Sequence, residues 1–462
     1  MALAPVPLFR ALRTSLCGGA LFLAACSGSD SSVDQEDSAI FSGTPKAEIG
    51  QFFMVEHYGV VAGGYSDVHD AIRRKNLGAV ILWNPTNASG EVTRQMIASY
   101  AGTAHAAQHD ELFVAADQEE HGTQRFKSAE GFTDLASGAQ LGAAVAASGE
   151  RVCELHAQIT AREMAQAGLN MALGTVSDIF TRTSGTPGMF RTRAIAADPA
   201  IVAKCITAMT KGYAEEGHVV FITKHFPGLG NASGNTDVDP SVHTESVTKA
   251  GMEQELAPYR AATAAVNVGD SGWPLFGAMV SHASYPILDG TGSPATLSPH
   301  ILDTILRGSS AQDLPGGVDR NQQAVTFKGM SLKGVTVSDA FWTWGAMHGL
   351  GPMEKRRLMA QSFLAGMDIL MIAKTDFAGA WDYFQALYAN QLPPAEQTAL
   401  VRATHEADWN AVHAKFVGRV DASAKRIRAV KTAVGPSSSF AGTGAANATS
   451  GDLVTEYEHL LH

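Results

Sequence analysis

The sequence has little cysteine, which limits the metal and disulfide chemistry open to it. Only four of its 462 residues are cysteines. No spacing of Cys and His is typical of a structural zinc site, so neither a metal nor another cofactor is expected. Two cysteines lie near the N-terminus, and the other two, Cys153 and Cys205, lie in apolar helical patterns. Buried thiols are the first expectation for this pair, and a disulfide is the alternative if the compartment is oxidising.

Basic residues are also too few to balance the acidic ones. The chain has 34 Lys and Arg against 45 Asp and Glu, a formal net charge of -11. This charge disfavours nucleic acid or an anionic membrane surface as the main partner. The sequence has no Walker loop, no dinucleotide-binding glycine motif and no Gly-x-Ser-x-Gly elbow. It therefore gives no support to an NTPase, a nicotinamide-dependent enzyme or a serine hydrolase of the elbow type.

No hydrophobic run is long enough to span a bilayer, but a short one lies near the N-terminus. Arg10 and Arg13 precede the run 16–25, which ends in Leu-Ala-Ala before Cys26. This pattern predicts a signal peptide, and its end resembles the lipobox of bacterial lipoproteins. The resemblance implies cleavage before Cys26, lipidation of its thiol and, because Ser27 follows, a lipid-anchored protein of a Gram-negative outer membrane, at the periplasmic face or the cell surface. An ordinary cleaved secretory signal is the alternative.

The rest of the chain divides by composition. We expect a signal peptide at 1–25, a Ser- and Asp-rich tether at 26–46, one folded domain at 47–435 and a low-complexity tail at 436–462. Within the domain, short apolar runs alternate with longer helical patterns, as in βα units. Eight runs qualify as strands, which predicts a single α/β domain with the (β/α)₈ TIM-type barrel fold. They are 51–55, 79–83, 112–116, 169–173, 217–223, 276–281, 334–338 and 367–372.

Ionisable residues gather where four of these strands end. In a barrel of this kind the carboxyl ends of the strands carry the active site. Each residue alone has a structural explanation, such as a helix cap or a buried hydrogen-bonded histidine, but four charged strand ends together favour a site. Carboxylates with Lys and His suit sugar chemistry. The residues are Asp117, Lys224, His225, His282 and Asp339.

Seven motifs follow one another along the chain, and the most characteristic is Lys-His-Phe-Pro-Gly at 224–228. The others are Gln-Phe-Phe-Met at 51–54, Asp-Gln-Glu with Gln-Arg-Phe at 117–126, Arg193 with Asp-Pro at 198–199, Ser-His with Tyr-Pro and Pro-Ala-Thr-Leu-Ser at 281–298, Gly-Val-Thr-Val-Ser-Asp at 334–339 and Ala-Gly-Met-Asp at 365–368. Together they resemble glycoside hydrolase family 3, in its single-barrel β-N-acetylhexosaminidase branch.

The resemblance implies a retaining double displacement through a covalent glycosyl-enzyme. Asp339 matches the nucleophile of the family. The residues that match its sugar-binding positions are Asp117, Arg125, Arg193, Lys224 and His225, and His282 at the end of the sixth strand is added to them.

The loop after the fifth strand departs from the family pattern. In this branch the acid/base is a His on that loop, oriented by an Asp two residues earlier. Here the only His on the loop is His243, four residues after Asp239, and the loop is longer. We expect His243 as acid/base with Asp239 as its orienter, and Asp237 is the competing orienter.

These observations predict an exo-acting β-N-acetylhexosaminidase, expected as a monomer, that hydrolyses terminal N-acetylglucosaminides of peptidoglycan- or chitin-derived oligosaccharides. Two alternatives stay open. One is a family 3 β-glucosidase or β-xylosidase. The other is a sugar-binding lipoprotein that has lost turnover through the altered loop.

Overall fold

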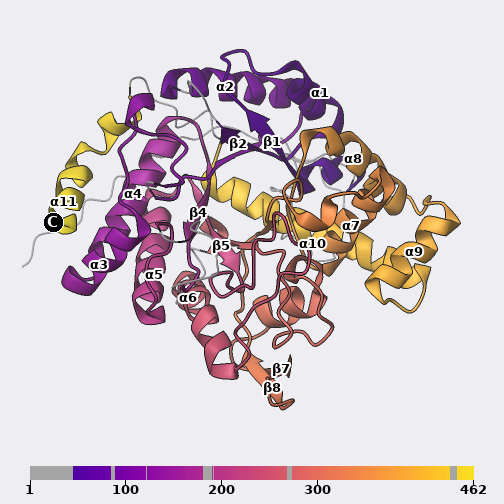
Figure 1. Ribbon diagram of the computed structural model, residues 1–462. Helices are drawn as coiled ribbons and strands as arrows, with labels where there is room; N and C mark the ends of the chain where they lie inside the picture. The colour runs from indigo at the N-terminus through magenta and orange to yellow at the C-terminus, as the bar shows by residue number, and fades with distance from the viewer. Residues whose placement is uncertain are drawn as a thin grey trace, which may run out of the picture. The chain divides into compact units, whose positions relative to one another are not determined.

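Eight parallel strands form the centre of the protein (Figure 1). The structure is a computed structural model and describes residues 45–84, 89–120, 122–180, 190, 192–267, 273–436 and 445–462. The expected signal peptide, the lipidation site Cys26 and the start of the tether lie outside these residues. The strands, in their order around the sheet, are β10 (Leu370–Ile372), β1 (Phe53–Tyr58), β2 (Ala79–Asn84), β3 (Phe113–Ala116), β4 (Met171–Val176), β5 (Val220–Phe226), β6 (Phe276–Val280) and β9 (Thr336–Ser338).

The sheet curls so that its two edge strands approach each other. Backbone hydrogen bonds join Thr336 and Ser338 to Ile369, just before β10. The strands are apolar on both faces because one face fills the barrel and helices cover the other; every residue of β5, for example, is buried. The eight predicted strands and the (β/α)₈ barrel are thus confirmed.

The helices lie around the strands and begin where the sequence carries capping signals. Asp198 accepts a hydrogen bond from the backbone N–H of Ala200 (2.8 Å), and Pro199 occupies the first turn of the next helix. An antiparallel hairpin, β7 (Asp313–Val318) and β8 (Ala324–Lys328), precedes β9. The helices are α1 (Ser66–Lys75), α2 (Gly90–Ala106), α3 (Gly138–Ser148), α4 (Arg151–Gln166), α5 (Pro199–Glu216), α6 (Lys249–Asn267), α7 (Pro352–Ala365), α8 (Lys374–Tyr388), α9 (Pro394–Thr404), α10 (Trp409–Val434) and α11 (Gly451–Leu461).

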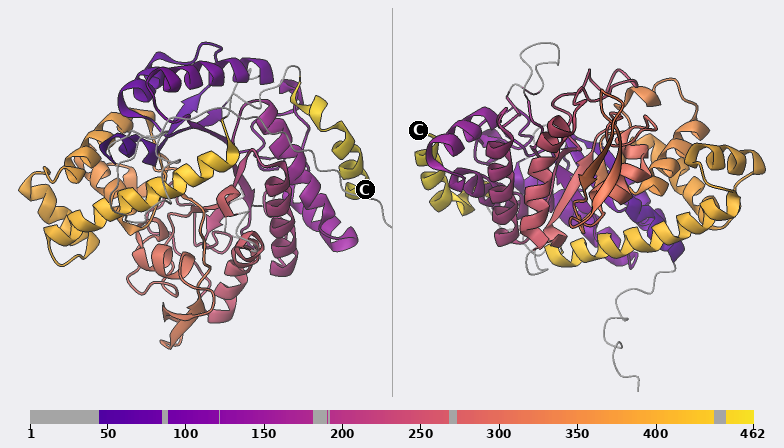
Figure 2. Two further views of the ribbon diagram at one scale, coloured as in Figure 1. Left: turned by 180° about the vertical axis from the view of Figure 1, so that it is seen from behind. Right: turned by 90° about the horizontal axis from the view of Figure 1, so that it is seen from below.

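The long helix α10 crosses the end of the barrel where the strands begin (Figure 2, left). Its residue Lys431 donates hydrogen bonds to the carbonyls of Gly78, directly before β2, and of Glu111, two residues before β3. At the same end the buried carboxylate of Asp368 binds three arginines, Arg307, Arg419 and Arg426. Burial would raise the pKa of Asp368, but the three guanidinium groups hold it well below its usual range. This end of the barrel is therefore covered, and within the described residues the opposite end, where the strands finish, is the one left open for a site in the barrel.

The C-terminal segment differs from the expected low-complexity tail. Residues 446–449 form a 3₁₀ turn, and α11 follows and packs against α4. The side chain of Tyr457 is fully buried, and Arg151 of α4 forms an ion pair with Glu456. The apolar residues of α11 recur at helical spacing, which supplies the buried face that a tail lacks.

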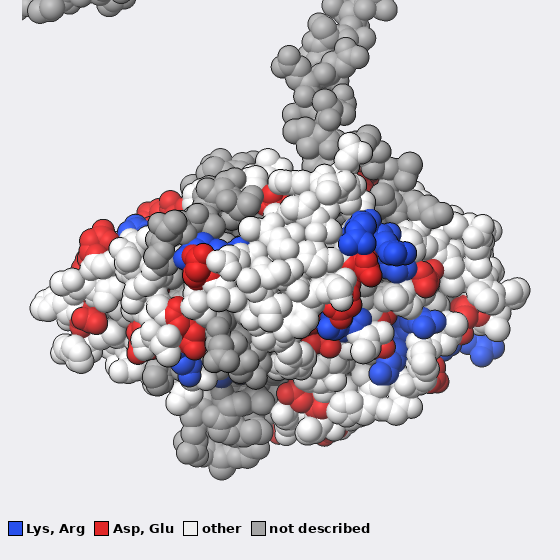
Figure 3. Space-filling view, turned by 90° about the horizontal axis from the view of Figure 1, so that it is seen from above, with Lys and Arg blue, Asp and Glu red and all other residues white. Residues whose placement is uncertain are grey.

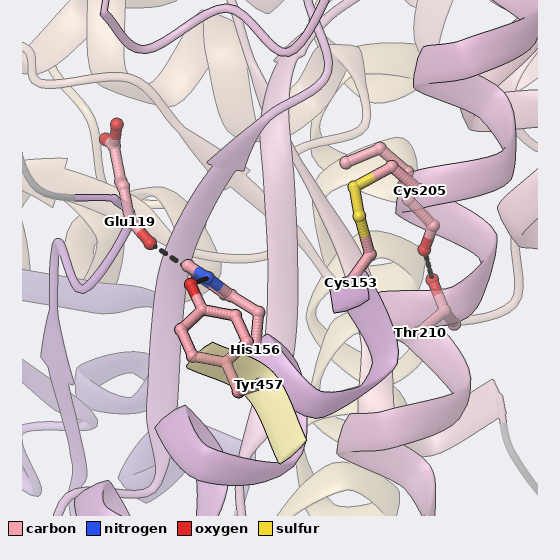
Figure 4. The surroundings of a disulfide bond; sticks show 7 residues. Glu119, Cys153, His156, Cys205, Thr210 and Tyr457 are labelled. Atoms are coloured by element: carbon pink, nitrogen blue, oxygen red, sulfur yellow. Dashed lines mark hydrogen bonds between the residues drawn. A yellow bond between two sulfur atoms is a disulfide. The ribbon is translucent and has the colours of Figure 1, made fainter. Parts of the chain in front are cut away.

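Cys153 of α4 and Cys205 of α5 form a disulfide, with their Cα atoms 5.3 Å apart (Figure 4). The expectation of two buried thiols was wrong, because the packing of α4 against α5 brings the two positions together. A cross-link between residues 52 apart in sequence stabilises a fold by about 2–4 kcal/mol.

Charges of both signs are interspersed on the face that carries α1 and α2 (Figure 3). Arg73 pairs with Asp70 in α1, and Arg94 pairs with Glu91 in α2. The acidic excess of the chain is therefore not concentrated on this face. None of the helices within the described ranges has both the length and the apolar character needed to cross a membrane.

Candidate active site

A pocket of about 250 Å³ lies at the carboxyl ends of the strands. Asp117 directly follows β3, Lys224 and His225 end β5, and Asp339 directly follows β9. Five of the six substrate-binding residues predicted from the sequence line this pocket with the predicted nucleophile Asp339. The full lining is Trp83, Asp117, Glu119, Thr123, Arg125, Arg193, Lys224, His225, Leu229, Asn235, Thr236, Asp237, Met279, Asp339, Ala340, Thr343 and Met371.

The ammonium group of Lys224 holds one wall of the pocket together. Its Nζ donates to Asp117 Oδ1 at 2.7 Å and to the carbonyl of Leu173 at 2.9 Å, and lies 2.5 Å from Glu119 Oε1. All three side chains are buried. Three acceptors occupy the three N–H donors of Lys224, so its main role is to hold the carboxylates of Asp117 and Glu119 in place.

Glu119 also forms a bidentate ion pair with Arg193, whose Nε and Nη2 donate hydrogen bonds to its two carboxylate oxygens at 2.8 and 2.9 Å. This bidentate pairing fixes the plane of the carboxylate. Burial alone would raise the pKa of Glu119, but the charges of Arg193 and Lys224 hold it far below its usual range. Glu119 is therefore ionised at any physiological pH and serves to position Arg193.

Arg125 reaches the pocket from the segment after β3. Its Nη2 lies 3.3 Å from Asp117 Oδ2, and its guanidinium carbon lies 5.1 Å from the centre of the Trp83 ring. Its buried Nε has no hydrogen-bond partner among the described residues. A buried N–H without an acceptor is unfavourable, so a ligand oxygen is a suitable partner for it.

His225 is oriented by Asp178, a buried acid two residues beyond β4. Asp178 Oδ2 lies 2.7 Å from His225 Nδ1, and Asp178 Oδ1 accepts from the backbone N–H of Leu229 at 2.6 Å. The carboxylate therefore fixes both the ring and the start of the following loop. Since Nδ1 is engaged, Nε2 is the ring nitrogen left for a ligand.

Asp339 has no ion-pair partner among the described residues. One oxygen accepts from the backbone N–H of Ala340 at 2.8 Å. Burial opposes ionisation, but the neighbouring His225, the Ala340 N–H and the more distant Lys224 together lower the pKa of Asp339. The structure thus places an ionised, unpaired carboxylate in the pocket.

His282 does not line the pocket. It is buried behind it, with its ring stacked on Trp344 at 4.2 Å and its Nδ1 2.9 Å from Thr296 Oγ1. Burial lowers the pKa of His282 to about 4, so the ring is neutral. In this position His282 supports the loop after β9 and does not reach a ligand directly.

Nor do His243 and Asp239 line the pocket, and both are exposed. The backbone of His243 is held by Ser233, through N–H to Oγ at 3.1 Å and carbonyl to N–H at 2.8 Å. The carboxylate of Asp239 accepts from the N–H and the hydroxyl of Ser241 and makes no hydrogen bond to His243. The expected acid/base pair is not assembled in this conformation.

The sequence did not predict Glu119 and Asp178 as residues of the site. It suggested Asp237 only as a competing orienter of the acid/base and not as a residue that lines the pocket. Glu119 lies two residues after Asp117, and Asp178 lies two residues after β4. Both positions are near strand ends, which is a signal that was available. The inward placement of Asp237 had no such signal, because it depends on the path of an irregular loop.

Helix α11 supports the pocket through two hydrogen bonds (Figure 4). His156 Nε2 lies 2.8 Å from the carbonyl oxygen of Glu119, and its Nδ1 lies 3.0 Å from the hydroxyl of Tyr457. Burial lowers the pKa of His156 to about 4. The ring is therefore neutral, with its proton on Nε2, and Tyr457 donates to Nδ1.

Replacing Tyr457 with Phe should lower the free energy of unfolding by about 1–3 kcal/mol, because it leaves His156 Nδ1 and the N–H of Ala136 without partners. Urea unfolding measures this change. Tyr388→Phe is the matched control, since the described residues offer its hydroxyl no hydrogen bond, and it should change stability by no more than about 0.5 kcal/mol. Equal stabilities for Tyr457→Phe and the wild type would contradict the role given to this contact.

Comparison with known proteins identifies the family. Residues 45–397 match the profile described as glycosyl hydrolase family 3 N terminal domain. A protein named beta-hexosaminidase from Stenotrophomonas maltophilia is 29% identical over 245 residues, which are 52% of this chain and 64% of that relative. The chain thus spans slightly less than two thirds of the relative's length.

Solved structures with the same fold lie at lower identity. A glycoside hydrolase family 3 β-N-acetylglucosaminidase from Paenibacillus sp. superposes with a TM-score of 0.69 at 21% identity, covering 91% of this chain and 69% of that one. A β-N-acetylhexosaminidase from Beutenbergia cavernae superposes with a TM-score of 0.63 at 24% identity, covering 85% and 99%. With a family match over most of the barrel, the chain belongs to glycosyl hydrolase family 3.

Proposed function

We propose that this protein is a retaining, exo-acting β-N-acetylhexosaminidase that releases terminal N-acetylglucosamine from oligosaccharides. The observation that carries the proposal is Asp339, an ionised carboxylate to which no described residue is ion-paired, in a pocket whose other wall is a network of paired charges. Asp339 Oδ attacks the anomeric carbon, the bond to the leaving oxygen breaks, and water later hydrolyses the glycosyl ester.

The charged wall suits the hydroxyls of a sugar. Arg125 offers its unpartnered Nε, and His225 offers Nε2, while Asp117 keeps lone pairs beyond those used by Lys224 and Arg125. Hydrogen bonds of sugar hydroxyls to charged groups contribute roughly 1.5–3 kcal/mol each. The small volume of the pocket favours one terminal sugar, hence exo cleavage.

The choice of an N-acetylated sugar rests on relatives named beta-hexosaminidase and on structures named as β-N-acetylglucosaminidases. A β-glucosidase or β-xylosidase is the alternative within the family, and a binding protein without turnover is the alternative outside it. Peptidoglycan or chitin fragments supply terminal N-acetylglucosamine and are the proposed natural substrates.

A panel of aryl glycosides tests the proposal. The purified protein should hydrolyse aryl β-N-acetylglucosaminide with a kcat/KM at least about 100-fold above that for the matching β-glucoside and β-xyloside, since a site built for the acetamido group leaves polar groups unpaired without it. The first-formed sugar, observed by NMR, should have the β configuration. Preference for the glucoside or xyloside would favour the alternative enzyme, and binding without hydrolysis would favour the binding protein.

The proposed location follows from the lipobox-like sequence before Cys26: a lipid anchor in a Gram-negative outer membrane. The anchor would hold at the membrane a protein whose described residues contain no helix able to cross it. Mass spectrometry of the N-terminal peptide of the native protein should find a lipidated Cys26. An unmodified N-terminus elsewhere would indicate an ordinary secretory signal.

A further inference from the structure

Four acidic side chains of the described residues line the pocket, and only two lack an ion-pair partner. Asp117 pairs with Lys224 and Arg125, and Glu119 pairs with Arg193 and Lys224. Asp237 and Asp339 form no ion pair with any described residue. Most retaining glycosidases use two carboxyl groups, one as nucleophile and one as acid/base, so this pair is a candidate for both roles.

The backbone fixes Asp237 at the pocket. The carbonyl of Thr236 accepts a hydrogen bond from the N–H of Gly345 at 2.8 Å, which ties this loop to the loop after β9. A Cβ on Gly345 would lie only 2.9 Å from Asp239 N, so the close approach requires glycine there. The N–H of Asp237 donates to Asn235 Oδ1 at 2.9 Å. These contacts hold the half-buried Asp237 on the same pocket as Asp339.

We propose that Asp237 is the general acid/base of the reaction, in place of the histidine that the family pattern suggests. The inference rests on the proposed glycosidase function. In the first step the Asp237 carboxylic acid gives its proton to the leaving oxygen as Asp339 bonds to the anomeric carbon. In the second step the Asp237 carboxylate takes a proton from water, whose oxygen bonds to the anomeric carbon as the ester to Asp339 breaks. Both carboxyl groups return to their starting states.

The surroundings of the two carboxyl groups suit this division. Burial raises the pKa of Asp237, and the charge of Asp339 raises it further, against the smaller effects of Thr343, His225 and Asn235. The pKa of Asp339 is lowered, as described above. Two carboxyl groups whose pKa values are pushed apart are the usual sign of an acid and a nucleophile. The other charged groups that line the pocket are the paired Asp117, Glu119, Arg125, Arg193 and Lys224.

Leaving groups of different acidity test the proposal in Asp237→Asn. For an N-acetylglucosamine disaccharide, whose leaving alcohol needs a proton, kcat/KM should fall by about 10²–10⁴-fold. For a dinitrophenyl glycoside, which needs none, it should fall by less than about tenfold. Azide should restore turnover by forming the β-glycosyl azide. The loss of activity at high pH that we expect of the wild type should disappear in this variant.

Asp319→Asn is the matched control. Asp319 caps backbone N–H groups in the turn between β7 and β8, outside the pocket, and this variant should keep wild-type kinetics. Asp237→Asn with unchanged disaccharide hydrolysis would overturn the proposal. The proposal would also be overturned if His243→Ala, and not Asp237→Asn, showed rescue by azide and a loss of activity that depends on the leaving group. A wild-type protein inactive on every glycoside would overturn the proposed function as well. Failure of the acid/base assignment alone can therefore be told apart from failure of the glycosidase function.

Discussion

Replacing Asp339 with Ala is expected to lower kcat/KM for an aryl β-N-acetylglucosaminide by about 10⁴-fold or more. Alanine removes the carboxylate assigned as nucleophile, which has no ion pair among the described residues and whose pKa is lowered, so the covalent intermediate can no longer form at this position. The measurement is steady-state hydrolysis at the pH optimum. In the wild type, activity should decline toward low pH with an apparent pKa below the ordinary pKa of an aspartate. The reason is that Asp339 must be ionised and its pKa is lowered.

Asp319→Ala serves as the control for this variant, since it removes a half-exposed carboxylate in the turn between β7 and β8 that does not line the pocket. Thermal unfolding should show that both variants are folded. If Asp339→Ala retained more than about a tenth of the wild-type activity, another group would have to be the nucleophile.

Replacing Lys224 with Met is expected to lower the free energy of unfolding by about 3–5 kcal/mol. The ammonium group lies between Asp117 and Glu119, both buried, and methionine of similar length leaves the two carboxylates facing each other without a counter-charge. Urea unfolding at neutral pH measures the change. Hydrolysis should fall in the same variant, because the freed carboxylates no longer hold Arg125 and Arg193 in place.

Lys204→Met is the matched control, because Lys204 lies exposed on α5 and has no ion pair with a described residue. It should change the free energy of unfolding by no more than about 0.5 kcal/mol. A similar small change for Lys224→Met would show that the buried pairs contribute nothing net to the fold.

The barrel was predictable because its strands are short, apolar and bounded by polar loops. The run 217–223 is one example, and β5 begins within it at Val220 and continues through Phe226. The same regularity placed Asp117, Lys224 and Asp339 at one end of the barrel, since parallel strands present their carboxyl ends together. Strand and strand-end residues therefore follow from the sequence.

Loops and contacts between helices did not follow in the same way. The disulfide depends on how α4 packs against α5, which no local pattern of Cys153 or Cys205 reveals. Helix α11 was missed because the Ala-, Ser- and Gly-rich sequence before it concealed a helical pattern at 453–461. The position of His243 depends on the contacts of its loop with Ser233, so motif spacing alone did not place it.

The most direct measurement traps the intermediate. A 5-fluoro N-acetylglucosaminyl fluoride forms glycosyl-enzymes faster than they hydrolyse, because fluoride leaves readily while the ring fluorine slows both steps. After reaction and proteolysis, mass spectrometry should find one sugar on the peptide that contains Asp339 and none on the peptide that contains Asp237. An adduct on another residue, or turnover without any adduct, would contradict a double displacement at Asp339.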